Sequence, residues 1–445
     1  MLCFAKNQDF SSVLIQGANI IIISIYETFL NKNHYSNFMS AKKEVDSSIH
    51  CVLGDRIAKV CEKHTGIKHE TINNSKIIHK ETCLHCGQCI KHDSIHETED
   101  MKKVLGELKT KKKVIACIAP AVRVSLGEEF GYPAGTIVTK KVIGALKKLG
   151  FSKVFDIVLG ADLMVMEKTI HFMDRINKQE TPMFTTCCPA WIKYIEIKHP
   201  EMKHLLSTIK SPQGILATLI KKYYTKKNNL KEKNVIVVNI MPCIAKKFEI
   251  KRPEYKDTDY VLTTKEFADL LKIKKIDLNN VKEKEFDKPL GESSGAGTLF
   301  GGTGGLTEAV FSNAKEVLKD SVLTEKEKKK LRQNKEVKKG TITIQNKKIK
   351  YVIVNKIKNI EKIIQEIKQG THYDFIEVMA CPSGCIGGGG QPCSDKKILD
   401  KRLEALHRIY EEKKVKTSKN NSELKQLYED VLNKKAKTML YIDRK

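Results

Sequence analysis

Short apolar runs alternate with longer amphipathic stretches over most of the chain. Runs of strand length occupy residues 114–118, 153–158, 182–186, 234–243 and 374–381, and apolar residues at helical spacing occupy 122–130, 139–149 and 161–176. Strands that alternate with helices favour layered α/β folds in which the sheets are mainly parallel. The pattern therefore predicts an α/β core, in which residues 340–368 add a strand, a turn, a second strand and a helix.

Three of the strand-like runs end at a cysteine. These cysteines are Cys188, Cys243 and Cys381. Sites in α/β proteins form in the crevice outside the carboxyl ends of the strands. The three thiols are therefore expected to converge although they lie far apart in the sequence. Glycines at 304–305 and 387–390 are expected to let the backbone approach a bulky group closely.

Composition divides the chain into four segments. Residues 48–105 are rich in Cys and His and poor in apolar runs, which is typical of small iron–sulfur modules in which the metal replaces a core. Residues 113–395 hold the α/β pattern, and residues 396–445 are charged and helical, which predicts a peripheral C-terminal wrap. Residues 1–47 form an extension without a predicted role. Within the core, the charged residues 326–339 are predicted to be a solvated face or loop.

Charge and hydropathy limit the classes of partner. The chain of 445 residues carries a formal net charge of +27. Solvated lysines account for most of this excess, and a basic face that attracts an acidic partner is the second interpretation. Nucleic-acid binding is disfavoured because aromatic residues are not interleaved with the basic ones. No apolar stretch approaches the roughly 18 residues of a membrane span, and the nearest, at 19–30, contains Glu27.

The N-terminus leaves two interpretations open. Residues 1–38 contain no Arg, which disfavours an organelle transit peptide, and no small-residue cleavage site follows the apolar stretch. The segment is therefore either a weak targeting sequence or an extension without a fold of its own. We expect an intracellular and reducing environment.

The chain has thirteen cysteines, and seven of them fall in tight spacings that are unlike a disulfide framework. The spacings are Cys83-x2-Cys86-x2-Cys89, Cys381-x3-Cys385 and the adjacent pair Cys187–Cys188. In a large protein such spacing favours metal sites over disulfides. The cysteine pattern therefore predicts metal binding in a reducing compartment.

The spacing near Cys83 indicates an electron-transfer cluster. Two-cluster ferredoxins use C-x2-C-x2-C-x3-C twice, and the fourth cysteine of each motif ligates the other cluster. Cys61, Cys83, Cys86 and Cys89 complete one such set, whereas the other set retains only Cys51. We therefore expect one accessory [4Fe–4S] cluster and one lost cluster. Zinc is the alternative for these thiolates and ranks second, because the spacing fits a ferredoxin motif.

Three segments around the remaining cysteines are similar to the signature segments of [FeFe] (iron-only) hydrogenases. They are TTCCPAW at 185–191, MPCIAKKFE at 241–249 and EVMACPSGCIGGGGQP at 377–392. The segments at 119–131, 150–168 and 291–311 resemble the same family, and the resemblance extends from about residue 48 to about residue 395. It implies a two-lobed α/β catalytic core with a small N-terminal ferredoxin-like module.

The resemblance implies an active-site cofactor, the H-cluster. Cys188, Cys243, Cys381 and Cys385 would hold a [4Fe–4S] cubane, since thiolates are the usual ligands of such clusters. Cys385 would also bridge to a diiron subcluster that carries carbonyl, cyanide and a dithiolate bridge. Dedicated hydrogenase maturation proteins would insert this subcluster. Buried unliganded cysteines are the ordinary alternative, but they do not explain matching motifs.

The same resemblance implies a route for protons. Cys187 would exchange protons with the diiron site, and Glu167 and Ser207 would continue the route outward. A thiol, a carboxylate and a hydroxyl relay protons when each reaches the next directly or through one water. The chain departs from the family at Ile170, where a second glutamate is frequent, so the outer end would use water or His171.

Three further residues complete the implied site. Lys246 matches a lysine that donates a hydrogen bond to a cyanide ligand, and its charge suits an anionic cluster. Met241 and Met379 would pack on the diiron unit, although core filling explains them equally well.

The sequence therefore favours a hydrogenase that reversibly reduces protons with electrons from reduced ferredoxin. The rival class is the non-catalytic cytosolic iron–sulfur assembly factors, which keep the cubane cysteines and carry a similar N-terminal cysteine set. Cys187, Lys246, Glu167 and the glycine-rich segment 291–305 favour the enzyme. A sensory relative is disfavoured because no signalling domain is visible. Such an enzyme would work in an anoxic, reducing compartment inside the cell, with the cytoplasm favoured over a hydrogen-producing organelle.

Overall fold

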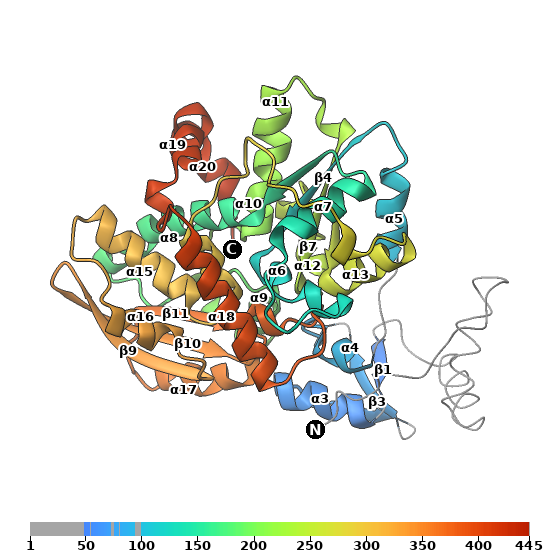
Figure 1. Ribbon diagram of the computed structural model, residues 1–445. Helices are drawn as coiled ribbons and strands as arrows, with labels where there is room; N and C mark the ends of the chain where they lie inside the picture. Colours follow the sequence, from blue (N-terminus) through green and yellow to red (C-terminus); the bar gives the residue numbers. More distant parts are fainter. Residues whose placement is uncertain (1–48, 54, 73–74, 80, 94–98, 445) are drawn as a thin grey trace. The chain divides into compact units, whose positions relative to one another are not determined.

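The computed structural model describes residues 49–444, apart from 54, 73–74, 80 and 94–98 (Figure 1). The chain divides into two compact units. The first comprises the residues up to Glu62 together with residues 67–83, and the second comprises residues 63–66 together with residues 84–445. The N-terminal extension of residues 1–47 lies outside the described residues.

The first unit contains a small antiparallel sheet in the order β1-β3-β2. Its strands are β1 (Ile49–Leu53), β2 (Glu70–Ile72) and β3 (Ser75–His79), and helix α3 (Asp55–Thr65) follows β1. The ferredoxin-like character of this module stays a prediction.

A parallel sheet in the order β5-β4-β7-β8 forms one lobe of the second unit. Its strands are β4 (Lys113–Ile118), β5 (Lys153–Asp156), β7 (Val235–Met241) and β8 (Tyr260–Thr263). Every residue of β7 is buried. Parallel strands covered on both faces have continuous apolar sequences of this kind, because neither face meets water.

The second lobe contains the sheet β6-β11-β10-β9, in which only the β9–β10 pair is antiparallel. Its strands are β6 (Met183–Phe184), β9 (Val337–Ile344), β10 (Lys347–Asn355) and β11 (Phe375–Met379). Gln345 and Asn346 connect β9 to β10, and both have positive φ angles, 44° and 63°. That turn geometry matches the twist of the paired strands.

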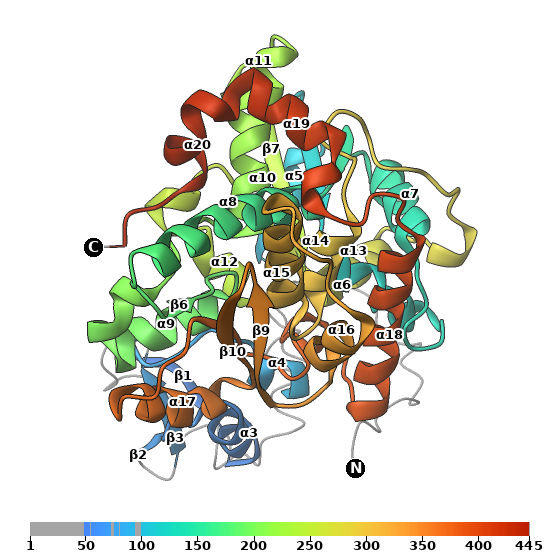
Figure 2. The same cartoon turned by 90° about the vertical axis from the view of Figure 1, so that its left-hand side faces the viewer.

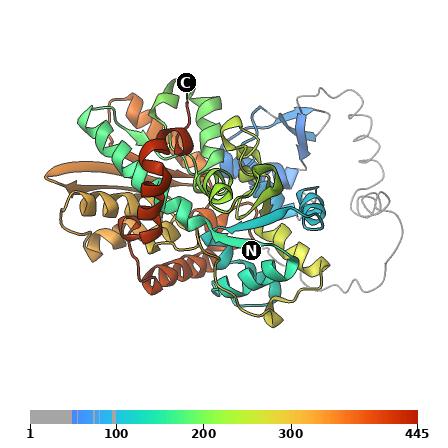
Figure 3. The ribbon, with the colours of Figure 1, turned by 90° about the horizontal axis from the view of Figure 1, so that it is seen from above.

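Helix α8 (Ile157–Asn177) packs between the lobes, against α10 (Pro212–Leu219) and α15 (Gly305–Val317). It begins where Asp156 caps the amide of Val158 at 2.9 Å, which satisfies one of the first free N–H groups. Figure 2 shows the C-terminal helices α19 (Ser422–Leu427) and α20 (Asn433–Leu440) beside α8, and the view from above agrees (Figure 3). Helix α18 (Lys396–Glu412) packs on the short helix α14 (Gly295–Thr298).

The remaining helices cover the two sheets. They are α4 (Gln88–Asp93), α5 (Glu99–Glu107), α6 (Pro120–Arg123), α7 (Thr139–Leu149), α9 (Pro189–Lys198), α11 (Thr225–Lys227), α12 (Ala245–Glu249), α13 (Thr264–Ile273), α16 (Glu325–Arg332) and α17 (Ile360–Lys368).

The α/β fold with mainly parallel sheets is confirmed, and one local prediction is wrong. The expected helix at 122–130 is instead α6 followed by a 3-10 turn, and the Ser125 hydroxyl between them lies within hydrogen-bond distance of the Ala121 carbonyl, at 2.8 Å, and of Gln391 Oε1, at 2.6 Å. Of the two alternatives for the charged stretch at 326–339, the solvated face is confirmed, because most of its side chains are exposed or half-buried. A capping box formed by Thr324 and Glu327 starts helix α16 within it.

Candidate functional site

The ends of three strands carry the cysteines of the candidate site. Cys188 follows β6 and is the N-cap residue of α9. Cys243 follows β7, and Cys381 follows β11. Cys385 begins a 3-10 turn four residues after Cys381. The two parallel sheets thus both contribute to one site from their carboxyl ends, as the apolar runs predict.

The electrostatics of these cysteines show that they are neighbours. The pKa of the Cys385 thiol is raised well above its usual value, first by desolvation and then by the negative charges of Cys187, Cys243, Cys188 and Cys381. The charges of Cys381 and Cys188 likewise raise the pKa of Cys243, and the charge of Cys188 raises the pKa of Cys381. Charges influence one another most strongly at short separations. These mutual influences indicate that the four expected cubane cysteines and Cys187 lie near one another, and the cubane that they would hold stays a prediction.

Thiols with raised pKa values need a cation to become thiolates. Desolvation raises the pKa of Cys381 to about 12 and that of Cys243 further still. Iron or zinc supplies the missing positive charge and deprotonates a thiol outright. In the part of the chain that the structure describes, no group of three or more Cys, His, Asp or Glu lies as closely as the ligands of one ion do. Sets of several thiolates are the usual ligands of iron–sulfur clusters, so the chemistry of these donors fits such a cluster.

Amide groups point at the sulfurs. The thiolate form of Cys188 accepts hydrogen bonds from the backbone amides of Ala380, Trp191 and Ala190, which lower its pKa against the desolvation that raises it. The amide side chain of Gln88 acts in the same way on Cys381. Donors of this kind stabilise negative sulfur, because a helix N-terminus and free N–H groups favour anions. The site is suited to an anionic cluster.

The glycines of the last motif allow loops to meet one another. A Cβ atom on Gly388 would lie 2.1 Å from the carbonyl oxygen of Pro242, beside Cys243. Gly384 has a φ of +92°, and a Cβ there would lie 2.8 Å from the amide nitrogen of Thr303. The close approach seen here is therefore to protein backbone, that of the Cys243 loop and that of the glycine-rich segment around Thr303. A larger residue would push these loops apart.

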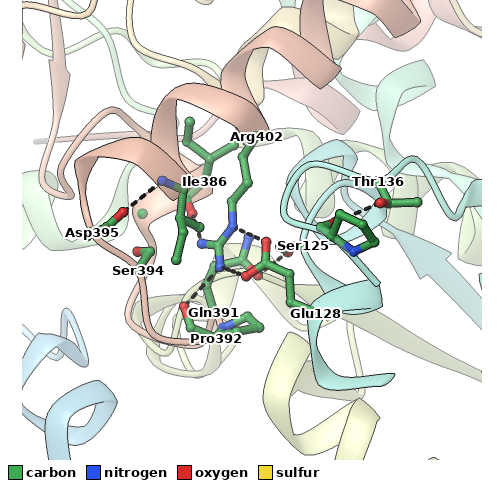
Figure 4. A network of polar contacts seen from close by, with 12 residues as sticks. Ser125, Glu128, Thr136, Ile386, Gln391, Pro392, Ser394, Asp395 and Arg402 are labelled. Carbon is green, nitrogen blue, oxygen red and sulfur yellow. Dashed lines mark hydrogen bonds and ion pairs between the residues drawn. The ribbon is translucent and has the colours of Figure 1, made fainter. Parts of the chain in front are cut away.

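Arg402 of α18 anchors the loop that carries Cys385 (Figure 4). Its guanidinium donates to both oxygens of Glu128, at 2.7 and 2.6 Å. It also donates to the carbonyl oxygens of Ile386, at 2.8 Å, and Pro392, at 3.2 Å. Arg402 is fully buried. One side chain thus joins the C-terminal helix, the Cys385 loop and the turn after α6.

We expect Arg402→Met to destabilise the protein by about 3–5 kcal/mol, because it leaves Glu128 as an uncompensated buried charge. The loop would also lose both carbonyl contacts, so iron content after reconstitution should fall. Chemical denaturation and iron analysis measure the two effects. Arg408→Met on the same helix is the matched control, because Arg408 is exposed and donates only to the Gly135 carbonyl. Equal stability of the two variants would contradict the anchoring role.

Cys187 lies near the expected cubane cysteines, and its backbone carbonyl oxygen accepts a hydrogen bond from a lysine. Desolvation raises the pKa of its thiol to about 12, the charges of Cys188 and Glu377 add to this, and Lys168 and Lys246 oppose it. Lys246 Nζ donates to the Cys187 carbonyl oxygen at 3.0 Å and to the Glu249 carboxylate at 2.9 Å. At neutral pH Cys187 is therefore a protonated thiol, and Lys246 is held beside it.

In the described part of the chain, hydrogen bonds join Glu167 and Ser207 to other groups, and not to Cys187 or to each other. The Glu167 carboxylate accepts hydrogen bonds from the hydroxyl of Tyr428 and, at 2.6 Å, from that of Tyr441. The buried Ser207 donates its amide to the Phe184 carbonyl at 2.9 Å, and its hydroxyl accepts from the Ile209 amide at 3.5 Å. Glu167 does not appear among the charges that shift Cys187. The relay from Cys187 through Glu167 to Ser207 stays a prediction.

Several residues near the site escaped the sequence analysis. Lys168 is the cation of α8 that acts on Cys187. The sequence could have indicated this residue, because Lys168, His171 and Arg175 are three, four and seven residues apart. Residues at those spacings share one face of a helix. Ile170, on a different face, is 56% exposed. The tyrosines that bind Glu167 lie more than 250 residues away and gave no local signal.

Met241 and Met379 are both buried, at 6% and 2% exposure, at the ends of β7 and β11. Their positions beside the cysteine loops agree with a role in packing on the cofactor and with core filling. Both interpretations remain.

The four N-terminal thiols belong to different units of the structure. Cys61 and Cys83 lie in the first unit, and Cys86 and Cys89 in the second. Cys61 and Cys86 are buried, at 8% and 7% exposure. The side chain of Cys51 lies outside the described residues. A cluster shared by the four thiols stays a prediction.

None of the helices in the described part of the chain combines the length and the apolar character that crossing a bilayer requires.

Comparisons with known proteins agree with this site. The family model "Iron only hydrogenase large subunit, C-terminal domain" matches residues 112–389, and "Iron hydrogenase small subunit" matches residues 396–440. The first match covers more than half of the chain, so the chain belongs to the iron-only hydrogenase family.

Individual relatives divide into two groups by name. The chain is 37% identical to Iron hydrogenase 1 of Clostridium pasteurianum, over 91% of this chain and 75% of that protein. It is 37% identical to NADP-reducing hydrogenase subunit HndD of Solidesulfovibrio fructosivorans, over 79% of this chain and 63% of that protein. It is also 29% identical to the cytosolic Fe-S cluster assembly factor narfl of Danio rerio, over 74% of this chain and 85% of that protein.

A solved structure of the [FeFe]-hydrogenase HydA1 from Chlamydomonas reinhardtii has the same fold. It matches with a TM-score of 0.68 and 32% identity, over 77% of this chain and 98% of that chain. The α/β core described above is therefore that of the [FeFe] hydrogenases.

Proposed function

We propose that the protein is a hydrogenase that interconverts protons and molecular hydrogen with electrons from reduced ferredoxin. The observation that carries this proposal is the fifth thiol. A cubane needs four thiolates, which Cys188, Cys243, Cys381 and Cys385 would supply. Cys187 is near enough to exchange charge influences with Cys188 and Cys385, and it is not needed as a ligand. A protonated thiol at that place serves a reaction that consumes or releases protons.

The cofactor that fits the site is an H-cluster. When bound, it supplies the redox chemistry of hydrogen, which no amino-acid side chain provides. The four thiolates would hold its cubane, and Cys385 would carry the link to the diiron part. Lys246 places a fixed positive charge beside Cys187, held by Glu249, which in turn accepts from Ser211 Oγ at 2.6 Å. That charge favours negative ligands such as cyanide.

The protein's own residues bind and shield the cofactor and handle the proton. Cys187 holds a proton on its sulfur and offers it inside the site. The cysteine loops, joined through Gly388 and Pro242, exclude bulk water from the cluster side. Met241 and Met379 supply apolar surface at the two strand ends. Hydrogenase maturation proteins would load the diiron part.

Electrons would arrive through the N-terminal module. Cys61, Cys83, Cys86 and Cys89 would hold an accessory [4Fe–4S] cluster, which stores one electron when bound. The net charge of +27 favours encounter with an acidic ferredoxin. We propose an anoxic location, the cytoplasm or a hydrogen-producing organelle.

An assembly factor for cytosolic iron–sulfur proteins is the alternative function, because a relative with that name is 29% identical. Such a protein needs the thiolates of a cubane but no group that exchanges protons inside the site. Cys187 with its neighbouring cations favours the enzyme.

Hydrogen evolution by the full chain tests the proposal. The protein is produced without oxygen together with hydrogenase maturation proteins, and infrared bands of carbonyl and cyanide establish that the diiron part is loaded. Hydrogen is then measured by gas chromatography with reduced methyl viologen as donor. We expect hydrogen above the background of the unmatured protein. A loaded protein that produces none would reject the enzyme and favour the assembly factor.

Cys61→Ala tests the accessory cluster. Because the cluster would lose one of its four thiolates, iron and sulfide content should fall by one [4Fe–4S] cluster relative to the wild type. Hydrogen evolution with reduced ferredoxin should fall more than with methyl viologen, which can reduce the active site directly. Cys393→Ala, a half-buried cysteine without an assigned role, is the matched control. Unchanged iron content in Cys61→Ala would reject the accessory cluster, and zinc in place of iron would favour the structural alternative.

A further inference from the structure

The cysteine motif at residues 86–89 lies in close contact with two loops of the candidate site. A Cβ atom on Gly389 would collide with the carbonyl oxygen of Cys86 and would lie 2.5 Å from the carbonyl carbon of Gly87. Gly87 has a φ of +76°, and a Cβ there would lie 2.6 Å from the side chain of Ile244. All of these residues belong to the second unit. The motif is therefore packed against the loop after β7 and the loop after β11, which carry three of the expected cubane cysteines.

Gln88 extends its side chain from this motif to the loop after β11. It is 5% exposed, and its Nε2 atom donates to the Gly387 carbonyl oxygen at 2.8 Å. The same side chain donates a hydrogen bond to the sulfur of Cys381. An amide nitrogen carries two hydrogens, so one NH2 group can serve both acceptors. A glutamine that only joined two loops would need the carbonyl contact alone, and Gln88 also contacts a sulfur.

Other contacts hold the loop at a fixed position relative to Gln88. The Ile386 carbonyl accepts from the buried Arg402 at 2.8 Å (Figure 4). The Gly390 amide donates to the Pro242 carbonyl at 3.0 Å, which ties the end of this loop to the loop after β7. Groups that surround a metal ligand fix its orientation and its basicity. The separation between the Gln88 amide and the sulfur is therefore preset by the fold.

A donor at this sulfur acts on the electron affinity of a bound cluster. Hydrogen bonds to the sulfurs are among the factors that determine the reduction potential of an iron–sulfur cluster. The ligand sulfur carries more negative charge in the reduced cluster, so an N–H donor stabilises the reduced state more than the oxidised state. The amide of Gln88 does not titrate, so its effect on the potential does not depend on the protonation of its own side chain.

We infer that Gln88 is a positioning residue that raises the reduction potential of the active-site cubane through its hydrogen bond to the sulfur of Cys381. The inference rests on the cubane of the proposed function and does not require hydrogen production. One electron enters the cubane as the electron carrier is oxidised, and no covalent bond of Gln88 forms or breaks. Because Gln88 lies between Cys86 and Cys89, the motif that would serve the accessory cluster also sets the affinity of the cubane for its electron.

The first test measures the reduction potential of the cubane in the full chain without the diiron part. The protein is reconstituted with iron and sulfide and titrated with dithionite under electron paramagnetic resonance. The signal of the cubane is identified by its absence from Cys385→Ser. Gln88→Leu removes both N–H groups at similar size, and Gln88→Glu keeps the shape, removes the donors and adds a negative charge.

Gln391→Leu is the matched control for these variants. Gln391 is likewise a buried glutamine of the loop after β11, at 2% exposure. Its amide donates to the backbone carbonyls of Ala121 at 3.1 Å and Cys385 at 3.5 Å. A purely structural role of a glutamine in this loop would therefore affect Gln391→Leu and Gln88→Leu alike.

We expect Gln88→Leu to lower the ratio of reduced to oxidised cubane at a fixed potential about tenfold, which corresponds to about 59 mV for one electron. Gln88→Glu should lower this ratio further, and Gln391→Leu should keep the wild-type ratio. Equal ratios in Gln88→Leu and the wild type would overturn the inference, as would equal shifts in Gln88→Leu and Gln391→Leu. Loss of the cubane from both Gln88 variants would mean that the residue only holds the loop. A wild type without any cubane signal would instead reject the cofactor of the proposed function.

The second test detects the hydrogen bond in the unaltered protein. Glutamine side chains are labelled with 15N, and pulsed electron paramagnetic resonance records the coupling of 15N to the reduced cubane. We expect one coupled nitrogen in the wild type, retained in Gln391→Leu and absent from Gln88→Leu. A wild-type cubane without 15N coupling would show that the Gln88 amide does not reach its sulfur, which would overturn the inference.

Discussion

Replacing Cys385 by serine should abolish hydrogen evolution and remove the active-site cluster. The pKa of the Cys385 thiol is raised by the charges of four other cysteines, Cys187, Cys243, Cys188 and Cys381, so Cys385 lies near all of them. A serine hydroxyl is a poor ligand for iron, since iron–sulfur clusters are held by thiolates. The loop itself should keep its place, because Arg402 contacts the carbonyls of Ile386 and Pro392 and no atom of the Cys385 side chain.

Iron and sulfide analysis and electron paramagnetic resonance measure this effect directly. We expect Cys385→Ser to lose the iron of one [4Fe–4S] cluster, to keep the signal of the accessory cluster and to produce no hydrogen above background. Cys393→Ser is the matched control, since Cys393 is half-buried and lies eight residues away on the same strand-to-helix connection. Full iron content in Cys385→Ser would mean that the cubane is not held by this set of four thiols.

Replacing Cys187 by alanine should lower hydrogen evolution by about 100- to 10,000-fold while the iron content stays that of the wild type. The expected factor is that of a single group that transfers protons in the rate-determining region. Alanine removes only the sulfur, and the contact between Lys246 and residue 187 is made by the backbone carbonyl, which the variant retains. The fold and the cubane thiols should therefore be undisturbed.

The pairing of activity with iron content separates the two functional classes. Loss of hydrogen evolution with intact iron supports Cys187 as the proton-exchanging thiol. Loss of iron in Cys187→Ala would make Cys187 a cluster ligand and contradict its assigned role. Cys117→Ala provides a comparison, because Cys117 is a fully buried thiol in β4 whose pKa is raised by desolvation and Asp156 and by none of the cluster cysteines. That variant should keep its activity.

The outline of the site was predictable from the sequence because its signals are local. Each apolar run that ends at Cys243 or Cys381 is a buried strand, β7 or β11, and the strand carries its cysteine to the carboxyl edge of a sheet. The periodicity of apolar residues determines such elements before any tertiary contact forms. The hairpin and helix at 340–368 were predictable for the same reason, and β9, β10 and α17 confirm them.

Errors occurred where a distant residue changes a local preference. The helix expected at 122–130 is interrupted at Ser125, whose hydroxyl contacts the side chain of Gln391, 266 residues away in the sequence. The charged segment at 326–339 was predicted to be a solvated face or loop, and the structure selects the solvated face, on helix α16 with only Leu331 of that helix buried. The Thr324 cap was visible in the sequence and could have selected the helix.

The sequence by itself determined the α/β class, the cysteine set and its chemistry, because hydrophobic periodicity and thiol spacing act over a few residues. Only the tertiary structure decided the surroundings of each side chain on α8. Glu167 and Lys168 are adjacent in the chain, but neighbouring residues on a helix point about 100° apart. The packing of α8 against α10, α15 and the C-terminal tyrosines buries Lys168 fully and gives the Glu167 carboxylate two tyrosine hydroxyls as donors.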